Sequence, residues 1–112
     1  MPKLTEKSCA ACRGNAHPLH GQELNDLRRE LPEWEVVAEH HLRREFRFPD
    51  FVQALAFVNR VGEIAEREGH HPDIELGWGR VAVTTYTHKV NALTESDFIL
   101  AAKIDAAYSK PA

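Results

Sequence analysis

The chain has 112 residues, the size of a single domain, and its 43% apolar and 28% charged content is typical of a soluble globular protein. This composition excludes an intrinsically disordered chain, and the formal net charge of -3 argues against nucleic acid as a partner. No apolar run approaches the roughly 20 residues that a membrane-spanning helix needs, and the N-terminus lacks the apolar core of a signal peptide. We therefore expect a cytoplasmic protein that binds neither nucleic acid nor a membrane.

The chain begins with a segment that shows no periodicity. Residues 1–19 are rich in small, polar, Gly and Pro residues, which predicts an irregular N-terminal arm ahead of a single domain over residues 20–110. Leucines at spacings of three and four then predict a short amphipathic helix over residues 21–31. Pro32 follows that helix and is expected to end it.

Two strands are predicted next. Apolar and polar residues alternate over residues 34–39 and 42–48, as they do in half-buried strands. The short link at His40 and His41 indicates an antiparallel hairpin. No acidic residue or third ligand is expected beside this histidine pair, so we interpret it as a solvated turn.

The second half of the chain carries a long helix, another pair of strands and a closing helix. Asp50 is a good N-cap for a helix that ends near Gly69. Alternation over residues 74–78 and 81–87 predicts a second hairpin. Residues 94–97 resemble a capping box ahead of the closing helix. The resulting order α-β-β-α-β-β-α predicts an α+β fold, in which helices pack on one face of a four-stranded antiparallel sheet.

The segment from Glu66 to Pro72 and the later His88 are the most informative residues of the chain. Gly69 ends the helix and Pro72 favours an extended conformation before it, so His70 and His71 occupy a helix-to-strand corner. The two arms of the second hairpin are nearly equal in length, so we expect His88 to approach this corner from the neighbouring strand. Glu66 lies one helical turn before the pair, where its carboxylate can accept a histidine N–H. Histidine titrates near neutrality, so these residues predict an acid–base site.

The stretch from Glu66 to Asp97 resembles the signature of the pterin-4a-carbinolamine dehydratase family. That signature is a Glu-x3-His-His-Pro sequence followed by an aromatic residue, a histidine and an acid. The matching residues are Glu66, His70, His71, Pro72, Trp78, His88 and Asp97. Looser similarity extends from about Leu19 to Tyr108. Gly69 departs from the pattern, since some members carry an acidic or amide side chain there, and an extra pocket contact at that position is in doubt.

The resemblance implies both a fold and an activity. Members of the family have four antiparallel strands with helices on one face, and they form dimers or dimers of dimers. They dehydrate 4a-hydroxytetrahydropterin to quinonoid dihydropterin, which recycles the pterin after an aromatic amino acid hydroxylase has used it, and they need no metal or organic cofactor. The resemblance makes His70 and His88 the acid–base groups and His71 a substrate-binding group. It also assigns four residues to lining or supporting the pocket, namely Glu66, Trp78, Thr87 and Asp97.

The N-terminal arm contains a possible zinc site. Cys9 and Cys12 are so close in sequence that a disulfide between them would stabilise the fold little, which favours a reducing compartment. Together with His17 and His20 they provide four ligand types that zinc accepts. The four-residue gap between the pairs is much shorter than in zinc fingers, and bacterial members of the family often show a similar arm. We expect no metal, but the sequence leaves this alternative open.

Two other classes of function are also compatible with the sequence. One is a noncatalytic dimeric module, because relatives of this fold act as a transcriptional coactivator and as assembly factors for a carbon-fixing enzyme. The presence of all three central histidines favours catalysis. The other is a small metal-binding protein that uses the arm or the histidine corner. Trp78 and Asp97 also have simpler interpretations, as a turn aromatic and as an acid that stabilises a helix N-terminus.

Overall fold

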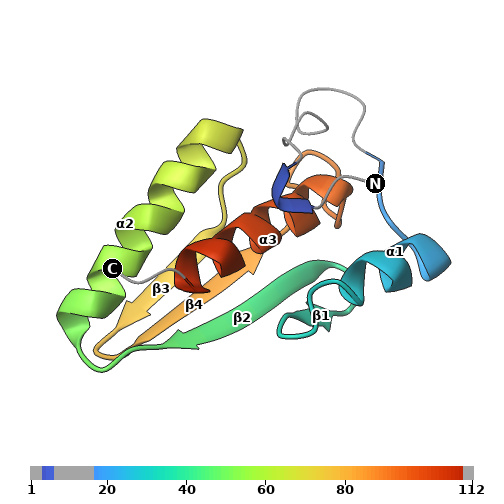
Figure 1. The fold of residues 1–112 in the computed structure, drawn as a ribbon. Coiled ribbons are helices and arrows are strands. Elements are labelled where there is room, and N and C mark those ends of the chain that lie inside the picture. Colours follow the sequence, from blue (N-terminus) through green and yellow to red (C-terminus); the bar gives the residue numbers. More distant parts are fainter. Residues whose placement is uncertain (1–3, 7–16, 110–112) are drawn as a thin grey trace.

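The computed structural model describes residues 4–6 and 17–109, and the α+β fold predicted from the sequence is confirmed (Figure 1). In chain order, its elements are η1 (Leu4–Glu6), α1 (Gly21–Arg28), β1 (Glu35–Val37), β2 (His41–Arg47), α2 (Phe51–Glu68), β3 (Asp73–Gly77), β4 (Arg80–Thr85) and α3 (Glu95–Ser109). The strands form one antiparallel sheet in the order β1-β2-β4-β3. Helices α2 and α3 lie side by side over one face of this sheet (Figure 1).

Helix α2 begins and ends at the residues predicted to cap it. The Asp50 carboxylate accepts a hydrogen bond from the backbone N–H of Gln53 at 2.9 Å, which satisfies one of the unpaired donors of the first turn. Gly69 adopts the left-handed conformation with φ 67°, which glycine tolerates without a steric penalty, and its N–H donates to the carbonyl of Ala65. These two caps determine where the chain enters and leaves the helix layer.

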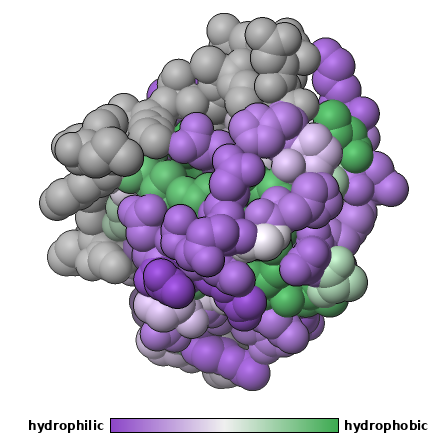
Figure 2. Space-filling view, turned by 90° about the vertical axis from the view of Figure 1, so that its right-hand side faces the viewer, coloured by the Kyte–Doolittle hydropathy of each residue, from purple (hydrophilic) through white to green (hydrophobic). Residues whose placement is uncertain are grey.

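The core lies between the sheet and the two long helices. Leu42 and Phe46 of β2 and Val81 and Val83 of β4 point to the helix face, because they occupy alternate strand positions, and all four are buried. Phe57 of α2 packs against Phe46 with a ring-centroid distance of 4.8 Å. Each such side chain contributes about 1.5–3 kcal/mol by its removal from water. The side of the molecule that carries α1 and β1 has mainly hydrophilic surface with smaller hydrophobic patches (Figure 2).

Several predicted boundaries differ from the structure by one to three residues. The connection between β1 and β2 lies at residues 38–40, and His41 is already the first residue of β2. Ala38 and Glu39 both have φ 54°, as in the tight turn whose twist matches that of the flanking strands. Helix α1 ends at Arg28 and not at Leu31, and the chain continues in turns in which the N–H groups of Glu30 and Leu31 donate to the carbonyls of Leu27 and Arg28. Strand β4 ends at Thr85 and not at Thr87.

The predicted arm and domain boundaries fall partly outside the described residues. Cys9, Cys12 and Lys110 belong to the segments that the structure does not describe. Within η1, the Leu4 side chain is buried in the same core as α3. In the part of the chain that the structure describes, no helix is both long and apolar enough to cross a membrane.

Gly79, in the turn between β3 and β4, has no room for a side chain. A Cβ atom at this position would lie 2.8 Å from the carbonyl oxygen of Phe48, whose N–H donates to the Gly79 carbonyl at 2.9 Å. We expect Gly79→Ala to lower the free energy of unfolding by about 1–3 kcal/mol, because a backbone atom has to move. Gly77→Ala is the matched control, since its nearest neighbour is at 3.8 Å. Urea unfolding of both variants measures the difference, and equal midpoints would contradict the prediction.

Asp105 of α3 connects the helix layer to the sheet. Its Oδ1 atom accepts hydrogen bonds from Trp34 Nε1 at 2.8 Å and from Arg44 Nη1 at 2.7 Å. Burial raises the pKa of the Asp105 carboxyl above its ordinary value of 3.8, and this effect outweighs the opposing hydrogen bonds and the Arg44 charge. The folded protein therefore holds the Asp105 proton more tightly than the unfolded chain does.

This raised pKa predicts a particular pH dependence of stability. Below the ordinary pKa both states are protonated and the contribution of Asp105 is fully present, and it is lost as the pH rises through the folded pKa. We expect the free energy of unfolding of the wild type, relative to Asp105→Asn, to fall as the pH rises from below 3.8 through the raised folded pKa. Urea unfolding of both proteins across this range measures the difference. A difference that rises with pH would contradict the predicted direction.

Candidate active site

His70 is turned into the protein at the C-terminal end of α2. The left-handed Gly69 reverses the chain, and the His70 N–H donates to the Ala65 carbonyl at 3.2 Å. The His70 side chain is buried, and its Nε2 atom lies 2.6 Å from Oδ1 of Asp97 at the start of α3. A buried charged partner at this distance makes a strong, oriented hydrogen bond. The sequence resemblance places these two residues in one predicted site but does not predict their contact.

Asp97 is fully buried, and its carboxylate faces four donors. Besides His70, these are the hydroxyl of Thr85 at 2.8 Å from Oδ1, the hydroxyl of Thr87 at 2.8 Å from Oδ2, and the backbone N–H of Thr94 at 3.0 Å from Oδ2. A carboxylate is buried at acceptable cost only when its oxygens are paired in this way, and the N-terminus of α3 adds a favourable dipole. The Thr94 contact is one half of the predicted capping box, in which the acid side chain reaches back to the N–H of the capping residue.

These contacts determine which ring nitrogen of His70 carries a proton. An ionised carboxylate only accepts hydrogen bonds, so His70 Nε2 must be the donor to Asp97. Nδ1 is then the ring nitrogen that Asp97 does not occupy. Thr87 donates to Asp97 and accepts from the Thr94 hydroxyl at 2.8 Å, which orients the hydroxyl groups as well. The site is therefore an oriented imidazole supported by a buried, hydrogen-bonded acid.

His71 faces solvent, whereas its neighbour His70 is buried. Its Nε2 atom donates to the carboxylate of Glu66, and both side chains are largely exposed. The histidine that Glu66 contacts is therefore His71, because the reversal at Gly69 carries His70 away from the exposed side of α2. An exposed pair of this kind contributes only about 0–1 kcal/mol to stability. The pair belongs to the candidate site because His71 is the neighbour of His70 in the chain.

His88 does not lie on a strand, although strand pairing brings its segment beside the histidine corner. Asp73 pairs with Thr84, so the residues that follow β4 run beside the segment that holds His70 and His71. Thr87 forms an isolated bridge with Ala92, and His88 begins the turn between them. Its ring lies on the Tyr86 ring with a centroid distance of 4.3 Å. Within the described residues, the structure shows no side-chain hydrogen bond between His88 and His70 or His71.

Trp78 lies far from the other predicted site residues. It is 71% exposed in the turn between β3 and β4, at the end of the hairpin away from the histidine corner (Figure 1). The five residues of β3 separate the two places by about 17 Å. Thr85 is the opposite case, because it contacts Asp97 although the sequence did not single it out. Its inward position on β4, two residues before Thr87, was the available signal.

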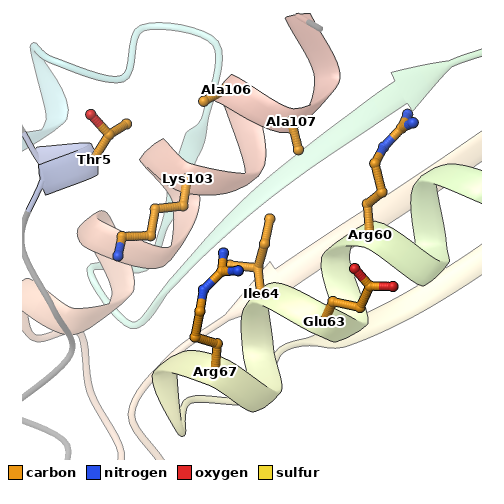
Figure 3. Close-up of a pocket in the computed structure, with 8 residues that line it drawn as sticks. All are labelled: Thr5, Arg60, Glu63, Ile64, Arg67, Lys103, Ala106 and Ala107. Atoms are coloured by element: carbon orange, nitrogen blue, oxygen red, sulfur yellow. The ribbon is translucent and has the colours of Figure 1, made fainter. Parts of the chain in front are cut away.

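A separate pocket of about 430 Å³ lies between α2 and α3 beside η1 (Figure 3). The described residues that line it include none of the predicted site residues, and they are Thr5, Arg60, Glu63, Ile64, Arg67, Lys103, Ala106 and Ala107. Among the described residues, no group of three or more His, Cys, Asp or Glu side chains is arranged to hold a metal ion. Cys9 and Cys12 lie outside the part of the chain to which this statement applies.

The fold and the site together define a small α+β protein in which a buried carboxylate at the start of α3 orients a histidine that follows α2. The model of the pterin 4 alpha carbinolamine dehydratase family matches residues 17–107. The chain belongs to this family, whose members are classed as hydro-lyases, and the resemblance noted in the sequence is confirmed.

Several relatives are similar over nearly the whole chain. A protein of Rubrobacter xylanophilus is 61% identical over 105 residues, which cover 94% of this chain and 98% of the relative. A protein of Alkaliphilus metalliredigens is 46% identical over 111 residues, covering 98% of this chain and 100% of the relative. Both are provisionally named pterin-4-alpha-carbinolamine dehydratase.

Two solved structures share the fold. A protein of Brucella melitensis, described as a transcriptional coactivator/pterin dehydratase, superposes with a TM-score of 0.79 at 34% identity and covers 83% of this chain and 100% of its own. A pterin dehydratase-like protein, described as a RuBisCO assembly factor in the alpha-carboxysome, has a TM-score of 0.61 at 25% identity and covers 70% of this chain and 93% of its own. The fold therefore occurs in proteins with different described roles.

Proposed function

We propose that this protein dehydrates 4a-hydroxytetrahydropterin to quinonoid dihydropterin and water. Membership of the family and the names of its relatives support this substrate. The observation that carries the proposal is the hydrogen bond of 2.6 Å between His70 and the buried Asp97. It supplies an oriented imidazole beside the exposed His71, as acid–base chemistry requires.

The reaction needs a proton at one atom and the loss of a proton from another. The bond between C4a and the hydroxyl oxygen breaks when the departing hydroxyl is protonated, and the pterin ring gives up a proton as its new double bond forms. His70 is suited to one of these transfers, because Asp97 holds and orients its ring. The carboxylate stabilises the positively charged ring that forms when the imidazole takes a proton, as acids behind catalytic histidines do elsewhere.

The remaining predicted residues complete the site in this proposal. His88 is the second acid–base group, while His71 with its partner Glu66 binds the substrate at the exposed rim. Thr87 and Asp97 support the site from beneath. The contribution of Trp78 rests on the family resemblance alone, because the structure places it about 17 Å along β3 from the corner.

The proposal is tested with purified protein and freshly generated 4a-hydroxytetrahydropterin. We expect the protein to accelerate dehydration over buffer at neutral pH, as followed by the absorbance of quinonoid dihydropterin. His20→Gln is the control for substitutions of the site histidines, because His20 is an exposed histidine at the start of α1 with no part in the proposed dehydratase site. Wild-type protein that leaves the rate in buffer unchanged would exclude the dehydratase function.

A noncatalytic role is the second candidate, and the two solved structures motivate it. Their descriptions name a coactivator and an assembly factor on the same fold. If this chain acts only in that way, His70→Gln and wild-type protein will be equally inactive in the dehydratase assay. A physiological link to an aromatic amino acid hydroxylase belongs to the catalytic proposal alone, and it predicts that the protein speeds turnover of such a hydroxylase when pterin recycling is limiting.

We also propose that copies of the chain associate as a homodimer or homotetramer. Phe51, Val52 and Leu55 are exposed apolar residues on the first turns of α2, and Val52 is 74% exposed. Exposed apolar groups of this kind often mark contacts between proteins. Light scattering during size-exclusion chromatography measures the mass, which we expect to fall towards that of the monomer in Val52→Glu. A monomeric wild-type protein would exclude association.

A further inference from the structure

We propose that Tyr86, His40 and Asn91 are positioning residues that hold the ring of His88 in place for proton transfer. The inference rests on the proposed role of His88 in dehydration. Three rings, those of His40, Tyr86 and His88, form what we call the aromatic stack. The sequence suggested only a solvated turn for His40 and His41, whereas the structure gives both side chains specific partners.

Strand alternation explains why Tyr86 faces His88. The hydroxyls of Thr85 and Thr87 both reach Asp97, so the Tyr86 side chain between them points away from Asp97. The centroid of the Tyr86 ring lies 4.3 Å from that of His88 and 4.5 Å from that of His40. The corresponding interplanar angles are 45° and 40°. The Tyr86 ring thus bridges the β1–β2 turn and the turn that carries His88.

Hydrogen bonds fix the other end of the aromatic stack. His40 Nε2 lies 2.9 Å from Oδ1 of Asn91, and His40 Nδ1 lies 3.1 Å from Nδ1 of His41. The amide oxygen only accepts, so His40 Nε2 is the donor to Asn91, and the two Nδ1 atoms of His40 and His41 face each other across one hydrogen bond. Burial lowers the pKa of His41, and the neighbouring His40 lowers it further. The neutral form of His41 that this favours is consistent with one proton shared between the two Nδ1 atoms.

Asn91 connects His40 back to the turn that carries His88. It belongs to the same turn as His88, it has φ 51°, and its N–H donates to the His88 carbonyl at 3.2 Å. His88 is therefore held through its own backbone, through Asn91 and His40, and through the ring of Tyr86. An exposed histidine without such contacts distributes among several rotamers. A ring contact of this type favours one rotamer by about 2- to 10-fold, and kcat depends on the fraction of molecules with His88 in place.

The experiment compares Tyr86→Leu, which removes the ring, with Tyr86→Phe, which keeps it. The His88 ring protons are assigned in two-dimensional NMR spectra as the signals missing from His88→Gln. We expect Tyr86→Leu to remove the ring-current shift of these protons and to lower kcat by about 2- to 10-fold with KM nearly unchanged. Tyr86→Phe should retain both. His40→Ala should produce a smaller change of the same kind, because it releases only the far side of the Tyr86 ring.

The NMR and kinetic results separate failure of this inference from failure of the proposed function. Unchanged His88 ring shifts in Tyr86→Leu would overturn the aromatic stack, whatever the activity. Altered shifts with wild-type kcat would overturn the positioning role. Loss of kcat in Tyr86→Phe as large as in Tyr86→Leu would do the same, since the ring is then not what matters. A wild-type protein without activity would remove the proposed function, while the ring shifts would still decide whether the stack exists.

Discussion

His70→Gln is expected to lower kcat for dehydration by about 10²- to 10⁴-fold, the usual contribution of a positioned acid–base group. The glutamine amide can still donate to Asp97 at the position where His70 Nε2 donates, so the buried carboxylate keeps a partner. What the variant lacks is a second nitrogen that can take and return a proton. Steady-state kinetics, with circular dichroism to confirm folding, measure the effect.

His71→Gln is the informative comparison for this prediction. His71 is exposed and paired with Glu66, so in our proposal it contacts the ground state and the transition state alike. Its replacement should therefore raise KM while kcat changes little. The His20→Gln control should change neither constant. If the His70 and His71 variants had the same kinetics as the wild type, the assignment of this corner as the site would be wrong.

Asp97→Ala is expected to lower the free energy of unfolding by about 3–5 kcal/mol, as removal of one partner from a buried charged pair does. The substitution would leave His70, the hydroxyls of Thr85 and Thr87, and the N–H of Thr94 without their shared acceptor in a buried place. An unpaired buried donor costs about 1–3 kcal/mol, and partial relaxation keeps the total below the sum of the four. Urea unfolding measures this change.

Glu66→Ala provides a control with the same chemistry and different burial. Glu66 and His71 also form a carboxylate–histidine pair, yet both are largely exposed, whereas Asp97 and His70 are buried. We expect Glu66→Ala to change stability by about 0–1 kcal/mol. Asp97→Asn should lie between the two, because its amide oxygen still accepts while its NH₂ group faces donors. Comparable losses for Glu66→Ala and Asp97→Ala would contradict the claim that burial makes the Asp97 network important.

Much of the fold was predictable because it depends on local rules. Alternating side chains placed the strands, the Asp50 and Gly69 caps defined α2, and the sequence Thr94 to Asp97 marked the start of α3. The predictions were wrong at the ends of helices and strands, where packing of the whole fold competes with the local conformational preference of the residues. The tight turn at Ala38 and Glu39 is the clearest case, because neither residue type signals the two positive φ angles found there.

The sequence by itself determined the fold class and the corner that holds His70 and His71, since spacing, caps and the proline at position 72 act over a few residues. Only the tertiary structure decided which acid meets which histidine. Gly69 sends one imidazole inward to Asp97, 27 residues along the chain, and leaves the other with Glu66 at the surface. It also decided that His88 lies on Tyr86. Such pairings depend on how distant segments pack, because burial and direction set the strength of a polar contact, and neither can be read from spacing along the chain.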